Sequence, residues 1–218
     1  MKKKLTEGRM VALIVAIALI IDQVIKISVK LGMRLHESIH ITDWFYIYFT
    51  ENPGMAFGME LFGKLFLTLF RIVAICWLVH YVCKIRKKDF PRGYLVCVAL
   101  IIAGAAGNVI DCIFYGPLFS ESTPYAVSHL VPWGDGYAPI LRGKVVDMFY
   151  FPLVSWYWPH WLPFIGGNHF IFFSPIFNFA DACISCGVIA ILIFYNRCLN
   201  WGFDGPEIET ANEKNAHK

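Results

Sequence analysis

Four long apolar runs constrain the fold of this chain more than any other feature of its sequence. They cover residues 10–29, 62–82, 94–115 and 172–195. Each is close to the roughly 20 apolar residues that a helix needs to cross the hydrocarbon core of a bilayer. Only 16% of the 218 residues are charged, against roughly 25% in a typical soluble domain. The sequence therefore predicts an all-α, multi-pass membrane protein with four transmembrane helices.

The first apolar run is predicted to be a retained helix. Basic residues precede it, as in a signal peptide, but it is long, lacks a small-residue cleavage site and contains Asp22 and Lys26. These two residues are four positions apart, so on a helix they share a face and can form an ion pair. The alternative is a pair near the helix end whose side chains extend to the membrane interface.

The segments between the runs predict a small extracytoplasmic β element and a long loop. Residues 40–50 are rich in β-branched and aromatic side chains, which is typical of a strand, and the sequence Glu51-Asn52-Pro53-Gly54 predicts a turn after it. Residues 116–171 read as a loop whose tryptophan-rich part suits the membrane interface. We expect one membrane-embedded domain over residues 1–202 and a polar, disordered cytoplasmic tail over 203–218.

The distribution of Lys and Arg predicts the orientation of the bundle. The N-terminal segment and the loop 84–92 are rich in these residues. The other two connecting segments contain only Arg34, Arg142 and Lys144. Because basic residues concentrate on the cytoplasmic side of membrane proteins, both termini are predicted to be cytoplasmic.

With this orientation, polar side chains from three of the runs and from the outer loop reach one depth near the outer surface. They are Asp22, Asn108, Asp111, Asp147, Asn178 and Asp181. A carboxylate within an apolar span costs about 2.5–3.5 kcal/mol even on the most lenient scale, so such residues are functional candidates. Two carboxylates in an apolar setting, such as Asp147 and Asp181, can share one proton as in an aspartyl protease. The alternative is a polar network that only holds the helices together.

Five motifs occur in order along the chain, and together they resemble those of the lipoprotein signal peptidases, the type II signal peptidases of bacteria. The motifs are Asp22-Gln23 with Lys26, TENPGMAFG at 50–58, GAAGNVID at 104–111, Val145-Val146-Asp147 and FNFAD at 177–181. The resemblance covers all four runs. It implies an aspartyl endopeptidase of the bacterial cytoplasmic (inner) membrane, with its active site near the outer surface. Such an enzyme removes the signal peptide from prolipoproteins just before a diacylglyceryl-modified cysteine.

The resemblance also implies roles for individual residues. It assigns catalysis to Asp147 and Asp181. Substrate binding or support of the site falls to Asp22, Lys26, Asn52, Gly54, Asn108, Asp111 and Asn178. The expected enzyme needs no cofactor and no metal. Its partners are the lipid-modified prolipoprotein and membrane lipid, with no nucleic acid, and it is expected to be a monomer.

The chain departs from the family pattern at the third run and after it. Cys112 follows Asp111 where the family usually has Arg, and Ala103 stands where the family usually has a first Gly. The stretch from Asp111 to Asp147 is also longer than in typical members. The basic residues near its end, at 142 and 144, are candidates to supply the missing cation.

A small proton-coupled transporter is the alternative function, because intramembrane Asp, Asn and Lys residues suit it equally well. A transporter would distribute polar residues through the depth of the membrane, whereas the cytoplasmic halves of these runs are nearly free of them. The letters of HExxH, the motif of zinc enzymes, occur at residues 36–40, but they lead into the predicted strand and not into the helix on which that motif works. The GxSxG motif of serine enzymes does not occur in the sequence.

Overall fold

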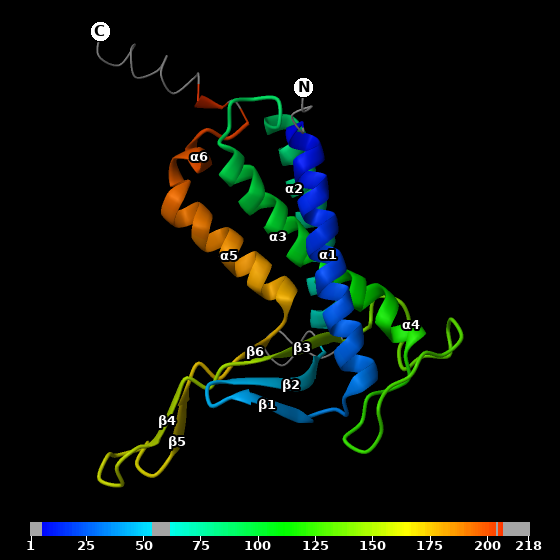
Figure 1. The fold of residues 1–218 in the computed structure, drawn as a ribbon, viewed down its shortest axis with the longest axis vertical. Helices are drawn as coiled ribbons and strands as arrows, with labels where there is room; N and C mark the ends of the chain where they lie inside the picture. Colours follow the sequence, from blue (N-terminus) through cyan, green and yellow to red (C-terminus); the bar gives the residue numbers. More distant parts are fainter. Residues whose placement is uncertain (1–5, 54–61, 204, 207–218) are drawn as a thin grey trace.

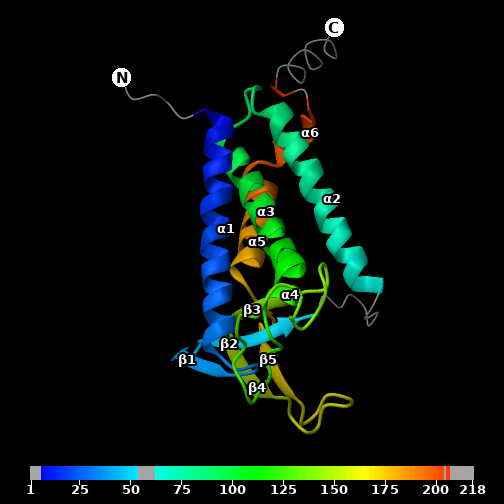
Figure 2. The same cartoon turned by 90° about the vertical axis from the view of Figure 1, so that its right-hand side faces the viewer.

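The computed structural model describes residues 6–53, 62–203 and 205–206, with the side chains of residues 62–64 excepted. These residues form long apolar helices that run side by side, with a small sheet at one end (Figures 1 and 2). The long helices are α1 (Glu7–Gly32), α2 (Phe62–Ile85), α3 (Arg92–Ile110) and α5 (Phe179–Phe194). An apolar run forms a helix in a bilayer because no water is available there to bond its backbone groups.

Helix α3 is the centre of the bundle, since it packs against α1, α2 and α5. It continues through a wider π-helical turn, η1 (Asp111–Tyr115), into the short α4 (Gly116–Leu118). Among the described residues, α1, α2 and this continuous helix through α4 are long and apolar enough to cross a membrane. Helix α5 has 16 residues and is shorter than the usual span.

The helix predicted over residues 172–195 begins too early. Phe172 ends strand β5 (His169–Phe172), and Ile176 and Phe177 form strand β6 (Ile176–Phe177), so α5 begins only at Phe179. The side chain of Asn178 caps the helix by accepting a hydrogen bond from the backbone N–H of Asp181. Because a short apolar segment fits a strand as well as a helix, hydrophobicity alone did not locate this boundary.

The main sheet lies at the end of the bundle where α1 finishes (Figure 1). Within the described residues its antiparallel order is β1-β2-β3-β6, from β1 (Ser38–Thr42), β2 (Phe45–Asn52), β3 (Val145–Tyr150) and β6. The predicted strand over residues 40–50 is thus a hairpin. The predicted turn is wrong at Glu51 and Asn52, which belong to β2 because they pair with Val146 and Val145. Gly54 lies outside the described residues.

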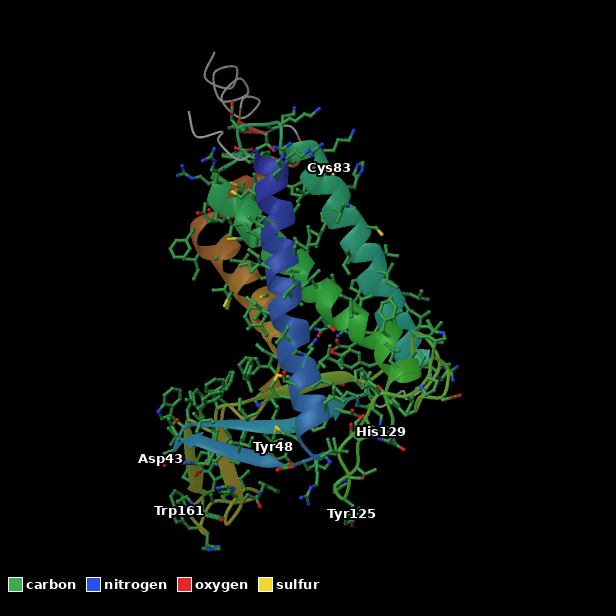
Figure 3. All side chains as sticks on the ribbon, turned by 45° about the vertical axis from the view of Figure 1, so that its right-hand side comes forward. Asp43, Tyr48, Cys83, Tyr125, His129 and Trp161 are labelled. Atoms are coloured by element: carbon green, nitrogen blue, oxygen red, sulfur yellow. The ribbon has the colours of Figure 1, made fainter. Side chains whose placement is uncertain are left out.

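A separate hairpin, β4 (Val154–Tyr157) with β5, projects beyond the main sheet and away from the helices (Figure 1). Trp161, at its tip, marks the far end of the molecule in Figure 3. The prediction of one long loop over residues 116–171 is therefore wrong in its second half, where β3, β4 and β5 arise. The predicted tail over 203–218 falls almost entirely outside the described residues.

Both ends of the described chain lie on one side of the bundle. The first turn of α1 and the short α6 (Asn196–Asn200) are at the end opposite the sheet (Figure 2). A buried cluster that includes Ile85, Leu95 and Val98 fills this end, and a second that includes Phe49 and Val146 fills the end near the sheet. Between these clusters α3 and α5 approach closely, which brings the polar start of α5 against α3.

Gly104 should be needed for this close approach. A Cβ atom there would overlap the carbonyl oxygen of Ala180 and lie 2.7 Å from Cγ1 of Ile184. We expect Gly104→Ala to destabilise the protein by about 1–3 kcal/mol through overpacking, which exceeds the gain in helix propensity of about 1 kcal/mol. Gly32→Ala is the control, because a Cβ there meets no atom within 4 Å. Thermal unfolding in detergent would contradict this if both variants unfolded at the same temperature.

Candidate functional site

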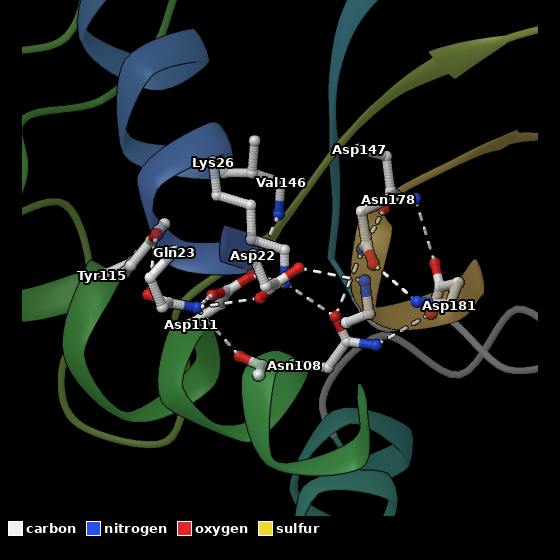
Figure 4. A network of polar contacts seen from close by, with 12 residues as sticks. Asp22, Gln23, Lys26, Asn108, Asp111, Tyr115, Val146, Asp147, Asn178 and Asp181 are labelled. Atoms are coloured by element: carbon white, nitrogen blue, oxygen red, sulfur yellow. Dashed lines mark hydrogen bonds and ion pairs between the residues drawn. The ribbon is translucent and has the colours of Figure 1, made fainter. Parts of the chain in front are cut away.

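The buried ammonium group of Lys26 joins two carboxylates and an amide (Figure 4). Its Nζ lies 3.0 Å from Oδ2 of Asp22 and 2.7 Å from Oδ2 of Asp111, and it donates a hydrogen bond of 2.9 Å to Oδ1 of Asn108. All four residues are at most 2% exposed. A charge is tolerated at such a place only when it is paired and hydrogen-bonded. The predicted ion pair of Asp22 with Lys26 is confirmed, and the interfacial alternative is wrong because both side chains are buried.

The two carboxylates around Lys26 are fixed by further bonds to several elements. Oδ1 of Asp22 accepts a hydrogen bond of 3.0 Å from the backbone N–H of Ala180 in α5. Nε2 of Gln23 donates to Oδ1 of Asp111 at 2.9 Å, and the hydroxyl of Tyr115 donates to Oε1 of Gln23 at 3.1 Å. Sequence analysis did not assign Gln23 or Tyr115 to the site. For Tyr115 the sequence signal was its spacing, since it lies one helical turn after Asp111.

Two asparagines connect Lys26 to the candidate catalytic aspartates. Asn108 accepts from Lys26 through Oδ1, so its Nδ2 faces the other way and donates to Oδ1 of Asp181 at 2.8 Å. Asn178 donates through Nδ2 to Oδ1 of Asp147 at 2.6 Å and to Oδ1 of Asn108 at 3.2 Å. Because an ammonium group can only donate, Lys26 fixes which end of the Asn108 amide is the acceptor.

The two candidate catalytic aspartates come from different elements. Asp147 lies in β3 and is only 4% exposed, whereas Asp181 lies in the first turn of α5 and is partly exposed. Burial raises the pKa of Asp147 to about 7, and the negative charge of Asp181 contributes to this rise, while the hydrogen bond from Asn178 opposes it. The N-terminal end of α5 favours negative charge on Asp181. Such a pair can hold one proton near neutral pH.

The structure brings most of the predicted site residues together. The bonded network contains Asp22, Lys26, Asn108, Asp111, Asp147, Asn178 and Asp181. Asn52 is the last residue of β2 and pairs in register with Val145, and Thr50, two residues before it, pairs with Asp147. Asn52 therefore lies on the strand next to the aspartate. The position of Gly54 relative to the site is not described.

A second buried lysine connects the long segment after α4 to the strand that carries Asn52. Nζ of Lys30 lies 2.5 Å from Oε1 of Glu51 and 3.0 Å from Oγ of Ser122, and Ser122 also donates to that Oε1 at 2.8 Å. Sequence analysis missed this cluster. Its signal was Lys30, which follows Lys26 by one helical turn and so shares its face.

Lys144 reaches the same cluster rather than Cys112. Its Nζ lies 3.5 Å from Oε2 of Glu51 and 3.3 Å from Oε1 of Glu121, and 5.3 Å from the ring centroid of Tyr137. Cys112 is buried, and its carbonyl accepts a hydrogen bond of 2.9 Å from the N–H of Gly143. Lys144 thus approaches the strand that ends at Asn52. Whether Lys144 or Arg142 takes over the role of the missing arginine stays a prediction.

The chain is similar to known proteins over nearly its whole length. A family model described as "Signal peptidase (SPase) II" matches residues 14–197. The lipoprotein signal peptidase of Porphyromonas gingivalis is 50% identical over 205 residues, which cover 94% of this chain and 90% of that protein. The lipoprotein signal peptidase of Amoebophilus asiaticus is 35% identical over 189 residues, covering 83% and 75%.

Solved structures show the same architecture. A bacterial membrane enzyme determined by the in meso method at 1.9 Å resolution superposes with a TM-score of 0.56 at 24% identity, covering 84% of this chain and 90% of that one. A second, determined by the same method at 2.3 Å resolution, has a TM-score of 0.55 at 25% identity, with coverages of 86% and 88%. The bundle with its small sheet is therefore the fold of a membrane enzyme.

Removal of the Lys26 charge should destabilise the protein strongly. Lys26→Met leaves Asp22 and Asp111 buried without their cation, for which we expect a loss of about 3–5 kcal/mol. The double variant Lys26→Met/Asp22→Asn should recover part of this loss, because one of the two unpaired charges is gone. Denaturant or thermal unfolding in detergent measures both. If the effects of Lys26→Met and Asp22→Asn on stability simply added in the double variant, the two residues would not be coupled.

Proposed function

The chain belongs to the signal peptidase II family, and on that premise we propose that Asp147 and Asp181 are the catalytic dyad with which it cleaves its substrate. Members of this family are peptidases that remove the signal peptide from prolipoproteins, and this is the activity of the chain. We further propose that cleavage occurs just before the lipid-modified cysteine. No described feature favours the transporter alternative over this activity.

The observation that supports the assignment of the dyad is the pair of hydrogen bonds that it accepts from two side-chain amides. Asn178 donates to Asp147, Asn108 donates to Asp181, and the two amides are bonded to each other. The Oδ1 atom of each aspartate is thereby fixed from the protein side. Oδ2 of Asp181 accepts only a long hydrogen bond of 3.4 Å from the backbone N–H of Asn178 and keeps a lone pair for water or substrate. Positioning of this kind is a large part of what an active site supplies.

In the proposed mechanism the pair begins with one shared proton. We place this proton on Asp147, whose pKa is raised to about 7, and the negative charge on Asp181. Ionised Asp181 takes a proton from the attacking water, whose oxygen bonds to the scissile carbonyl carbon. Asp147 donates its proton to the carbonyl oxygen, which gives a tetrahedral diol.

Collapse of the diol completes the reaction and restores the pair. Asp181 gives the proton it took from water to the leaving nitrogen, the C–N bond breaks, and a diol hydroxyl returns a proton to Asp147. The two carboxyls act as one titrating unit throughout, so the resting state is regenerated with one proton between them. No step in this sequence requires a metal or another cofactor.

The other site residues hold the catalytic groups and the substrate in place and take no part in making or breaking bonds. Lys26, Asp22 and Asp111 hold Asn108 from the side opposite the dyad, as the contacts around the ammonium group indicate. We propose that Asn52, at the exposed end of β2, binds the substrate backbone beside the dyad, together with Gly54.

We propose a topology with four spans and both termini in the cytoplasm. The basic loop 84–92 and the common end of α1 and α6 support it. The dyad then lies near the outer surface of the inner membrane, where a lipid-modified substrate enters sideways from the bilayer. Residues 1–202 act as one monomeric domain in this proposal.

Loss of either aspartate should abolish cleavage. Asp147→Asn and Asp181→Asn each remove the shared-proton chemistry while keeping the volume of the side chain. The double variant should be no worse than either single variant, because residues that act as a unit are not additive. A gel-shift assay on a lipid-modified prolipoprotein measures turnover, with Asp43→Asn as a control, because Asp43 is an exposed residue of the β1–β2 turn. Near-normal turnover of either single variant would rule out the aspartyl mechanism.

Cleavage should also decline as the pH rises above about 7. The pKa of Asp147 is raised, so its proton is retained below that pH and lost above it. Once both carboxyls are ionised, neither can protonate the carbonyl oxygen. We expect kcat/KM to fall about tenfold per pH unit above this pKa, which is the loss of one proton. Thermal unfolding at each pH separates this effect from denaturation, and a flat profile between pH 6 and 9 for folded enzyme would contradict it.

A further inference from the structure

Two adjoining hollows lie at the end of the bundle opposite the dyad. The first is an apolar groove of about 430 Å³ between α2, α3 and α5. Its lining includes Trp77 and Tyr81 from α2, Ile101 from α3, and Val188 and Leu192 from α5. The groove follows the helices from the level of α6 towards the middle of the bundle.

The second hollow, of about 420 Å³, is basic. It is lined by His80, Lys84, Lys88 and Phe203. Phe203 also lines the apolar groove, and its ring packs edge-on against Tyr81 at 5.3 Å and against His80 at 6.3 Å. Phe203 therefore lies where the basic hollow and the groove adjoin.

We propose that the two hollows together bind one anionic glycerophospholipid, with its phosphate among the cationic side chains and an acyl chain in the groove. Lys84 and Trp77 are seven residues apart on α2, about 10 Å along the helix axis. The site for the acyl chain therefore lies deeper in the membrane than the site for the headgroup. Tyr81, which packs against Phe203 where the two hollows meet, suits the level of the lipid headgroups. Basic pockets between helices on the cytoplasmic side are typical sites for such headgroups.

The charge of the basic hollow favours a lipid over the signal helix of a substrate. A signal peptide begins with a positively charged segment. In the topology proposed above, that segment would lie at the same end as Lys84 and Lys88 and would be repelled by them. The inference uses the proposed function only for this comparison and for the choice of leaflet, because lipid binding can be measured without cleavage.

The direct test is lipid retention by the purified full chain in detergent. Native mass spectrometry would compare dioleoylphosphatidylglycerol with dioleoylphosphatidylcholine, and thermal unfolding would follow the same additions. We expect the anionic lipid to be retained preferentially and to raise the unfolding temperature, since a ligand of the folded state stabilises it. Glycerol phosphate, which has the headgroup charge but no acyl chain, should have neither effect.

Paired variants separate a defined site from a diffuse charge effect. Lys84→Gln should lower retention of the anionic lipid about fivefold, the contribution expected of one basic residue near a lipid phosphate. Lys87→Gln, which removes the same charge from an exposed neighbour that does not line the hollow, should leave retention within about twofold. Val188→Trp should fill the groove and also lower retention, whereas Ile189→Trp, on the outer face of α5, should not.

Three results would overturn the proposal. Equal retention of the two lipids would show that the headgroup charge is not recognised. Equal effects of Lys84→Gln and Lys87→Gln would show a diffuse basic surface. A change in unfolding temperature for Lys84→Gln that is the same with and without lipid would show that Lys84 does not contribute to lipid binding. Normal cleavage by Lys84→Gln would leave the assignment of the dyad untouched.

Discussion

The buried ammonium group of Lys26 is the interaction on which the rest of the site depends. Removal of an ion from water costs several kcal/mol, and a buried charge is stable only when its partners are correctly arranged. Here the partners are Asp22, Asp111 and Asn108, so one cation fixes residues of α1, α3 and η1. Asp22 also ties α5 to this cluster, because its Oδ1 accepts a hydrogen bond from the backbone N–H of Ala180. The same contacts stabilise the fold and determine which atoms of Asn108 face the aspartates.

The position of the site at the junction of helices and sheet explains how the two aspartates differ. Asp147 comes from a central strand and is almost completely buried, so its carboxyl resists ionisation. Asp181 comes from the first turn of a helix, where backbone N–H groups and the helix dipole favour a carboxylate. Two residues of one chemical type thereby receive different electrostatic surroundings. The roles proposed for them, Asp147 as proton donor and Asp181 as base, follow from these different surroundings.

The sequence predicted the helices and most of the site because both depend on strong physical constraints. Apolar length identifies membrane helices, and the distribution of basic residues placed Asp22, Asn108 and Asp181 at one depth before any contact was known. The strand around Asp147 and the start of α5 were not predicted. A short apolar segment such as 145–150 carries no period that separates a strand from a helix or a buried loop. The cluster of Lys30, Glu51 and Ser122 depends on tertiary pairing of distant segments, which one sequence does not show.

The central claim is that the dyad holds one proton near neutral pH and that this proton is associated with Asp147. Infrared difference spectroscopy of the purified enzyme, titrated from pH 5 to 9, observes protonated carboxyl groups directly. The account predicts a carboxylic acid signal that disappears with a midpoint near 7 and is absent from Asp147→Asn. If no carboxylic acid signal titrated in this range, or if Asp147→Asn retained it unchanged, the shared-proton dyad would be contradicted.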